Sequence, residues 1–377
     1  MPSTVIVRYG ELAIKSESVR KRFERILVES IKRALVGLNY KIRIIRGRIF
    51  VDTNSTATVI KRLANLPGIT SLSPSVRTKA KMQDIRAQAV RSAKKVLREG
   101  MAFAVRTNRV GEHPFSSRDV NIDIGASILS AIGGIRVDLS NPDVEVSIDI
   151  RDEDAYVFIK TVKGVGGLPV GTQGKVISLF SGTRNDATAA FLMLKRGCKV
   201  YLLFLNPQRN LNNPMSKRVV SSARKLARFD PTMVLLSFPF KEILAALHKK
   251  SLEKFEFYIC RRCELHAAEI VAKRVGAEAI VIGDDAAQIK MQRLANLKVT
   301  DEVCKLAVLR PIAGLNDQEI GQTVEKMGMK SFNFNPICRI PSGEVMSLEE
   351  IRNMEKEINI YAIFDEASRK IKTVKIG

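Results

Sequence analysis

The sequence contains no long apolar run. No uninterrupted apolar stretch reaches the roughly 18 residues that a membrane-spanning helix requires. The first residues, Met-Pro-Ser-Thr, do not begin the charged and then apolar segment of an export signal. We therefore expect a cytoplasmic protein that does not enter a membrane.

Cysteine is scarce, with five residues in a chain of 377. An odd count in a long chain with no export signal argues against a disulfide framework and favours free, catalytic or metal-binding thiols. Cys198 and Cys304 lie in apolar segments, which predicts buried structural thiols. The candidates for chemistry are therefore Cys260, Cys263 and Cys338.

Acidic residues are in the minority. The chain has 39 Asp and Glu against 62 Lys and Arg, which gives a formal net charge of +23. The basic residues are spread along the sequence rather than gathered in a tail, which predicts a wide basic face on a folded body. RNA is the expected partner of such a face. The alternative is a generally basic surface of the kind found in thermophiles, with no role in binding nucleic acid.

The chain also lacks a Walker loop, yet residues 175–206 have the pattern of a nucleotide-binding unit. A short apolar run predicts a buried parallel strand, which stops at Ser181 and Gly182. A helix follows, Gly197 ends it, and residues 200–205 form the next strand. A Ser/Gly turn before a helix presents N–H groups to an anion such as phosphate. It could equally serve only to turn the chain.

Other segments indicate a multidomain α/β protein. Breakers between Lys163 and Gly171 predict a linker. We therefore divide the chain into modules of residues 1–75 and 76–165, a linker at 166–174, and a doubly wound parallel-sheet domain at 175–377. In the first two modules, periodicity predicts strands at 4–7 and 102–107, helices at 18–35, 57–63, 82–97 and 120–132, and hairpins at 41–52 and 144–162.

Several longer motifs occur in one order along the chain. They are RYGELAIK (8–15), FAVR with PFSS (103–117), VDLSNPD (137–143), GGLPVGTQGKV (166–176), RRCELHAAEIVAKR (261–274), GDDAAQIKMQRLANL (283–297) and VLRPIAGLNDQEI (308–320). In this order the chain resembles the tRNA 4-thiouridine synthase family, ThiI. The resemblance implies a ferredoxin-like domain at 1–75, a THUMP RNA-binding domain at 76–165 and a pyrophosphatase-loop domain at 175–377. The C-terminal rhodanese domain of some relatives is not matched.

The resemblance also implies an activity. Members of this family bind ATP, adenylate a tRNA uridine, and let a sulfur nucleophile displace AMP to leave 4-thiouridine. The nucleotide contacts implied here, with Mg²⁺ as companion, are Leu179, Phe180, Ser181, Gly182, Asn185, Asp186, Phe204, Leu205, Arg261, Gly283 and Gln292. Strand ends of an α/β sheet are where nucleotides bind. The apolar members of this set also fit plain core packing.

The loop departs from the family's SGGxDS pattern. Thr183 replaces the second glycine, Asn185 the aspartate and Asp186 the final serine. Thr183 would be strained if its position requires a positive φ. Asn185 removes a carboxylate that could hold magnesium, whereas Asp186 could hold the ion and Arg184 could add positive charge beside phosphate.

The sulfur chemistry is expected to depend on the Cys260-x-x-Cys263 pair. We expect this pair at a helix N-terminus, where the dipole, Arg261 and Arg262 would lower the thiol pKa. Archaeal-type relatives carry such a pair, and Cys338 matches a further cysteine of the family. These thiols suit either a persulfide resolved as a disulfide or a [4Fe–4S] cluster held by all three, with one iron open to hydrosulfide. The sulfur donor would be a cysteine desulfurase or inorganic sulfide.

RNA contacts are expected on the second module and its neighbour. Shape and phosphate contacts favour four basic residues, Arg106, Arg109, Arg118 and Lys163. The resemblance suggests a homodimer. Two alternatives stay open: a tRNA-binding protein whose altered loop does not adenylate, and, ranked last because it uses a rhodanese domain, sulfur transfer for thiamine thiazole synthesis.

Overall fold

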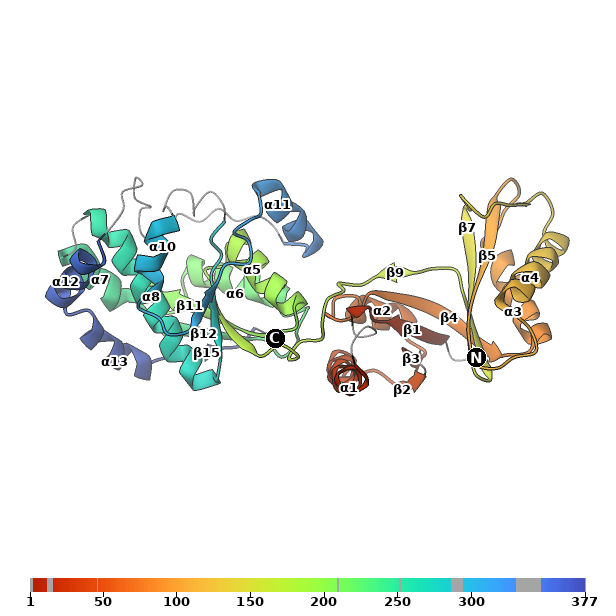
Figure 1. Ribbon diagram of the computed structural model, residues 1–377, viewed down its shortest axis with the longest axis horizontal. Coiled ribbons are helices and arrows are strands. Elements are labelled where there is room, and N and C mark those ends of the chain that lie inside the picture. Colours follow the sequence, from red (N-terminus) through yellow and green to blue (C-terminus); the bar gives the residue numbers. More distant parts are fainter. Residues whose placement is uncertain are drawn as a thin grey trace. The chain divides into compact units, whose positions relative to one another are not determined.

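The chain folds into two compact units, Met1–Leu168 and Pro169–Gly377. The computed structural model describes residues 3–11, 16–45, 47–208, 210–250, 253–285, 294–329 and 347–376 (Figure 1). Gln292 and Cys338 lie outside these residues. Among the helices described, none has both the length and the apolar character needed to span a bilayer.

The first unit is built on one nine-stranded sheet with the order β2-β3-β1-β4-β8-β7-β5-β6, and β9 pairs with β4. The strands are β1 (Ser3–Arg8), β2 (Tyr40–Ile45), β3 (Arg48–Thr53), β4 (Ser71–Lys79), β5 (Ala102–Val110), β6 (Arg136–Val137), β7 (Val144–Arg151), β8 (Asp154–Phe158) and β9 (Val162–Lys163). The helices are α1 (Glu17–Ala34), α2 (Thr56–Leu63), α3 (Met82–Lys94) and α4 (Ser117–Ala131). Each helix expected from periodicity in this unit is present.

Strand β4 joins the two halves of this unit and was missed by the sequence patterns. It pairs antiparallel with β1 on one side and with β8 on the other. The expected division after residue 75 falls inside this strand, so the two halves share a continuous sheet. The finer domain boundaries stay predictions.

The sheet of the first unit curls, so that strands distant in the strand order meet. Helices α1 and α2 pack on Val5 and Val7, while α3 and α4 pack on the β5–β7 part of the sheet. On the face of the sheet turned away from α1 and α2, Ile6, Phe50 and Tyr156 form a separate apolar cluster. The rings of Phe50 on β3 and Tyr156 on β8 stack with centroids 4.3 Å apart, although β1 and β4 lie between their strands in the sheet.

The second unit is a doubly wound α/β domain, as expected. Its six-stranded sheet has the order β14-β13-β10-β11-β12-β15. All neighbouring strands are parallel except β12 and β15. The strands are β10 (Lys175–Leu179), β11 (Lys199–Asn206), β12 (Val234–Pro239), β13 (Ala279–Val281), β14 (Ala307–Leu309) and β15 (Lys372–Val374).

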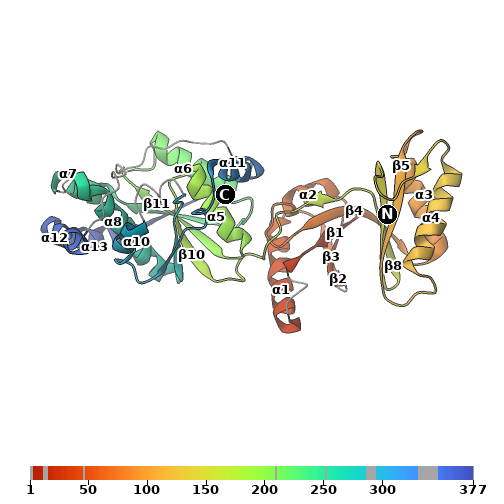
Figure 2. The same ribbon diagram turned by 45° about the horizontal axis from the view of Figure 1, so that its top comes forward.

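Helices cover both faces of this second sheet (Figures 1 and 2). Those described are α5 (Arg184–Lys195), α6 (Pro214–Leu226), α7 (Lys241–Lys250), α8 (Glu253–Val275), α10 (Leu294–Asp301), α11 (Asp317–Lys326), α12 (Leu348–Ile358) and α13 (Tyr361–Arg369). The largest apolar cluster of the unit lies between the sheet and α7, α8, α12 and α13. This cluster includes residues from the carboxyl ends of β10 and β11, which places α8 against the strand ends where a ligand is expected.

Candidate functional site

The candidate site lies where the strand order of the second sheet reverses. The chain proceeds from β10 to β11 and β12 on one side, and places β13 and β14 on the other side of β10. Such a switch point leaves a crevice outside the carboxyl ends of the two diverging strands, where α/β proteins bind ligands. Ser181 and Gly182 follow β10 at this point, and Gly283 and Asp284 follow β13.

The turn after β10 adopts a positive φ at Gly182 rather than at Thr183. Gly182 has φ +85°, and a Cβ there would lie 3.1 Å from the Cα of Val219. Thr183 has φ −67° and is the N-cap of α5, where its Oγ1 accepts the N–H of Asp186 at 3.2 Å. The condition under which Thr183 would be strained, a positive φ, is not met, because the residue takes the role of a helix cap.

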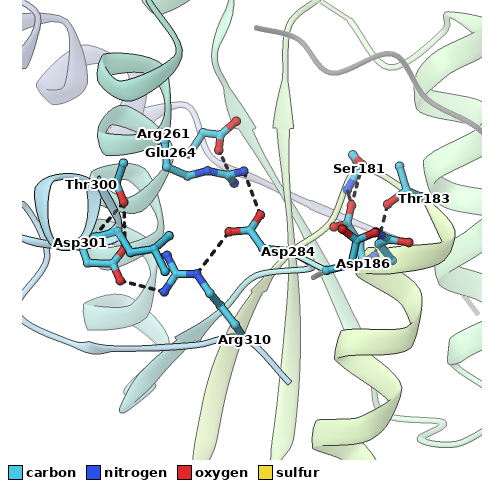
Figure 3. A network of polar contacts seen from close by, with 12 residues as sticks. Ser181, Thr183, Asp186, Arg261, Glu264, Asp284, Thr300, Asp301 and Arg310 are labelled. Atoms are coloured by element: carbon cyan, nitrogen blue, oxygen red, sulfur yellow. Dashed lines mark hydrogen bonds and ion pairs between the residues drawn. The ribbon is translucent and has the colours of Figure 1, made fainter. Parts of the chain in front are cut away.

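Asp186 binds the groups that were expected to hold phosphate. Its Oδ2 accepts the backbone N–H of Ser181 at 2.8 Å and the Ser181 hydroxyl at 2.5 Å (Figure 3). Burial raises the pKa of the Asp186 carboxyl, although the hydrogen bonds from Ser181 act in the opposite direction. A carboxylate of the chain itself therefore occupies the anion-binding turn.

Gly283 allows this close arrangement of β13 and α5. A Cβ at this position would lie 2.6 Å from Oδ1 of Asp186 and 2.8 Å from its backbone nitrogen. No side chain fits there without displacing the start of α5. The close approach expected at Gly283 is thus made to Asp186, while its contact with a nucleotide stays a prediction.

A chain of ion pairs extends from α8 across the strand ends. Arg261 donates through Nη1 to Oε2 of Glu264 at 2.9 Å and through Nη2 to Oδ1 of Asp284 at 3.1 Å. The second oxygen of Asp284 accepts from Nε of Arg310 at 3.2 Å, and Arg310 binds both oxygens of Asp301 at 2.7 and 2.8 Å (Figure 3). The sequence patterns did not identify Asp284, Arg310 or Asp301. The acidic pair after the apolar segment 279–282 was the available signal.

The charges of this network are strongly coupled. Burial acts to lower the pKa of Arg261, but Asp284 and Glu264 outweigh it and hold the pKa above its ordinary value. Burial raises the pKa of Glu264, with further increases from Asp284 and Asp186. Within the described residues, Nε of Arg261 is buried and makes no hydrogen bond. The guanidinium thus keeps an unused donor beside the switch point.

Two further side chains of the loop are engaged by carboxylates. Asn185 donates through Nδ2 to Oδ2 of Asp285 at 2.8 Å. Arg184 forms an ion pair with Asp317 at the start of α11. The side chains of Ser181, Arg184 and Asn185 therefore each contact a carboxylate of the protein.

The apolar residues assigned to the nucleotide site have buried side chains: Leu179, Phe180, Phe204 and Leu205. Their side chains belong to the core, so only their main chain is available to a ligand. The N–H of Phe180 donates to the carbonyl of Leu203 at 2.9 Å, which holds the ends of β10 and β11 side by side.

The expectation that the cysteine pair lies at a helix N-terminus was wrong. Cys260 and Cys263 lie inside α8, which begins at Glu253, so the helix dipole does not act on them as proposed. Their exposed fractions are 2% and 1%, and they pack in the same apolar cluster as Leu179 and Leu205. The apolar segment before Cys260 is helical rather than a strand or loop.

Arg262 was also misassigned. It donates to both oxygens of Glu355 at 2.6 and 3.1 Å, to the carbonyl of Val299 at 2.7 Å and to Glu302 at 3.1 Å. Arg262 and Glu355 are both buried. The guanidinium therefore ties α8 to α10 and α12 instead of activating a thiol.

The remaining thiols differ in exposure. Cys198 is buried as expected, and burial raises its pKa. Cys304 is only half-buried, which corrects the expectation of a buried thiol, and burial again raises its pKa. No cluster of three or more metal-ligating side chains occurs within the described residues. Because Cys338 lies outside them, the three-thiol iron–sulfur site stays a prediction.

The four expected RNA contacts are not gathered in one place. Arg106 on β5 pairs with Glu145 at 3.3 Å, and Arg109 on the same strand donates to the carbonyl of Gly111 at 3.1 Å. Arg118 is exposed in the first turn of α4, and Lys163 is exposed on β9. Lys163 therefore lies beside β4, several strands from the other three.

Comparisons with known proteins agree with this architecture. Family models match three consecutive parts of the chain: the ThiI ferredoxin-like domain at residues 4–73, the THUMP domain at 79–160, and Thiamine biosynthesis protein (ThiI) at 171–357. Among solved structures, a 4-thiouridine synthetase in complex with RNA and ATP has a TM-score of 0.87 and 24% identity, with 100% of both chains covered. PH1313 from Pyrococcus horikoshii Ot3 has a TM-score of 0.69 and 28% identity over 87% of this chain and 100% of that one.

Curated relatives cover almost the whole chain. The probable tRNA sulfurtransferase of Methanothermobacter thermautotrophicus is 32% identical, with 94% of this chain and 95% of the relative covered. Its counterpart in Methanosarcina acetivorans is 31% identical over 100% of this chain and 94% of the relative. The chain therefore belongs to the ThiI family of tRNA sulfurtransferases.

Proposed function

We propose that the protein is an ATP-dependent sulfurtransferase that forms 4-thiouridine in tRNA. The observation that carries this proposal is the position of Arg261. It lies between Cys260 and Cys263 on α8, and its guanidinium contacts Asp284 at the switch point of the sheet. One residue thereby connects the cysteine pair with the crevice where a nucleotide would bind.

ATP would bind across the ends of β10 and β11. Main-chain groups at Phe204 and Leu205 would contact the adenine, and the turn at Ser181 and Gly182 would face the phosphates. Phosphate and the Asp186 carboxylate repel one another unless a cation lies between them. Mg²⁺ commonly uses one or two carboxylates together with phosphate oxygens. An ion bound by Asp186 would therefore let this carboxylate help to hold the phosphates instead of repelling them.

The reaction would proceed in two displacements. O4 of the uridine attacks the α-phosphorus of ATP and pyrophosphate leaves, and Arg261 is placed to balance the negative charge. A sulfur nucleophile then attacks C4 and AMP leaves with the oxygen. A persulfide on one cysteine, supplied by a cysteine desulfurase, could provide the sulfur; a second cysteine would then break the S–S bond by forming a disulfide with the first. Alternatively, a cluster held by the cysteines would present inorganic sulfide as the nucleophile, with no change in the oxidation state of the sulfur. Since Cys260 and Cys263 are buried, the end of the sheet beside α8 must open before their sulfur reaches a base.

Reconstitution tests this proposal. The full chain would be incubated with an unmodified tRNA transcript, ATP, Mg²⁺ and sulfide, or with a cysteine desulfurase and cysteine as donor. We expect nucleoside mass spectrometry to detect 4-thiouridine, and omission of ATP to abolish it. Absence of the product with both donors, from protein that binds ATP and tRNA, would contradict the proposal.

A second candidate is a tRNA-binding protein that does not adenylate its ligand. The contact of Asp186 with the Ser181 N–H favours it, because that donor is then withheld from phosphate. Isothermal titration distinguishes the two candidates. Tight tRNA binding without ATP binding at millimolar Mg²⁺ would favour the second.

A further inference from the structure

A second polar cluster lies in the first unit, beside the apolar cluster that contains Ile6, Phe50 and Tyr156. Arg8 ends β1, Arg48 begins β3 and Arg151 ends β7. The pairing of Val7 with Ile49 continues to Arg8 and Arg48, so these residues are neighbours on adjacent strands. Strands from both halves of the unit therefore contribute arginines to one place.

Positive charge exceeds negative charge in this cluster. Nε of Arg151 lies 2.7 Å from Oδ1 of Asp149, and Nε of Arg48 lies 3.8 Å from Oδ2 of the same residue. Arg8 donates to the hydroxyl of Ser73 at 2.8 Å rather than to a carboxylate. Arg48 and Arg151 thus share the carboxylate of Asp149, while no ion pair is present at Arg8 within the described residues.

A neighbouring group of charges on the same face is more evenly matched. There Arg43 contacts Asp52 at 3.0 Å and Asp154 at 3.6 Å. Arg77 contacts Asp154 at 2.7 Å. Two guanidinium groups are matched there by two carboxylates, and Asp154 also lies opposite Arg151 in the pairing of β7 with β8.

One donor in the arginine cluster is left without a hydrogen bond. The side chains of Arg151 and Asp149 are each only 3% exposed, and Nε of Arg151 already faces Oδ1 of Asp149. Within the described part of the unit, Nε of Arg48 is buried and makes no hydrogen bond. Buried donors without acceptors are costly and rare in folded proteins. An anionic acceptor would satisfy this donor and would also balance the charge.

The cluster is held in a fixed geometry. The guanidinium of Arg8 lies over the ring of Phe158, 4.8 Å from its centroid. Burial lowers the pKa of Arg8, and the neighbouring charges of Arg48 and Arg151 lower it further, although Asp149 acts in the opposite direction. Residues that are directly opposite in a sheet point to the same face. Arg8 is opposite Ser71, and Ser71 is opposite Lys163, so the exposed Lys163 lies on the same face as Arg8, two strands away.

We propose that Arg8, Arg48 and Arg151 form a binding site for a phosphate group of the RNA backbone, with Lys163 at its rim. Guanidinium groups bind phosphate oxygens through paired N–H donors. Several guanidinium groups together offer more donors and more positive charge than one carboxylate can use, which suits a phosphate. The inference rests on the proposed function, since tRNA is the polyanion that this function requires. It adds a location that joins the two halves of the first unit.

Three variants of the full chain test the site. Arg48→Gln removes a charge from the cluster, Lys163→Gln removes an exposed charge at its rim, and Arg91→Gln removes one from an exposed position on α3. Fluorescence anisotropy would measure binding of an unmodified tRNA transcript at several KCl concentrations. We expect Arg48→Gln to weaken binding about 5- to 20-fold and to reduce the salt slope by about 1. Arg91→Gln should change binding less than about twofold.

Each result of these binding measurements either supports or overturns the proposed phosphate site. Thermal unfolding reports whether Arg48→Gln folds, and Lys163→Gln, at an exposed site, gives the same test with no disturbance of the core. Wild-type affinity and salt slope in both variants would overturn the inference and leave the proposed function intact. Failure of the wild-type protein to bind tRNA would overturn both. Stabilisation by inorganic phosphate that Arg48→Gln abolishes, with tRNA binding unchanged, would assign the site to a free anion and overturn the RNA assignment.

Discussion

At the scale of single residues, we expect Asp186 to control phosphate binding by the loop after β10. Its carboxylate accepts both donors of Ser181. We expect Asp186→Ser, measured without Mg²⁺, to bind ATP about tenfold more tightly, because a negative charge is removed and the Ser181 donors are released. With Mg²⁺ the wild-type protein should gain more affinity than the variant, since Asp186 would hold the ion. Isothermal titration measures both.

Asp317→Asn is the matched control for this prediction. It also removes a carboxylate that contacts the loop, at Arg184, but from an exposed position on α11. Its effect on ATP affinity should be smaller than that of Asp186→Ser. Equal affinities of the wild-type protein and Asp186→Ser, with and without the ion, would show that this carboxylate does not control the loop.

Gly283 offers a second test at this scale. Gly283→Ala would force its Cβ to within 2.6 Å of Asp186, against the backbone at the start of α5. We expect a loss of about 1–3 kcal/mol in the free energy of unfolding, as for overpacked interiors, together with weaker ATP binding.

Gly125→Ala, inside α4, is the control for Gly283→Ala. A Cβ there meets nothing within 4 Å, so alanine should stabilise the helix by up to about 1 kcal/mol. Chemical denaturation measures both changes. Equal stability of Gly283→Ala and the wild-type protein would mean that the strand end and α5 separate easily.

At the scale of elements, the buried Arg262–Glu355 pair fixes α8 against α12. Arg262→Met would leave Glu355 buried without its main cation, and we expect a loss of about 3–5 kcal/mol. The double variant Arg262→Met with Glu355→Leu should recover much of this loss, because neither charge remains buried. Urea unfolding of the single and double variants gives the comparison. A double variant as unstable as Arg262→Met alone would indicate that the pair is not what holds the helices together.

How far the sequence reveals an element depends on where its hydrogen bonds and contacts come from. The segment β10–α5–β11 was predictable, because its apolar runs and the glycine that ends its helix, Gly197, are local signals. Strand β4 was not, because its sequence SLSPSVRTK is polar and contains proline. Pairing with β1 and β8 makes it a strand, and those partners are distant in sequence.

In the candidate site too, local features were predictable and contacts between distant segments were not. The turn at Ser181 and Gly182 was found from the local pattern, whereas the link from Arg261 through Asp284 to Arg310 joins three elements. The position of the cysteine pair within α8 was missed because FEFYI before Cys260 alternates as a strand does and becomes helical through packing in the core. Tertiary contacts therefore decided the features that the sequence patterns missed.

At the scale of the whole molecule, the shared sheet predicts that the first unit unfolds as one body. Val76 on β4 pairs with Ser3 of β1 and with Val157 of β8. Val76→Pro removes a ladder hydrogen bond from a central strand, and we expect hydrogen exchange to increase in both α1 and α3. Val137→Pro, on the short strand β6, should have a much weaker effect. Increased exchange confined to α1 would indicate that the two halves fold independently.

The burial of Cys260 and Cys263 has a practical consequence. A maleimide or a peroxide molecule has almost no access to the sulfur atoms of residues that are 2% and 1% exposed. Alkylation of these two cysteines would therefore be limited by the rate at which the surrounding core opens locally. Peptide mass spectrometry of the labelling, with and without tRNA, would measure that opening rate. The same shielding would protect a loaded sulfur atom from cellular oxidants while the protein waits for its RNA.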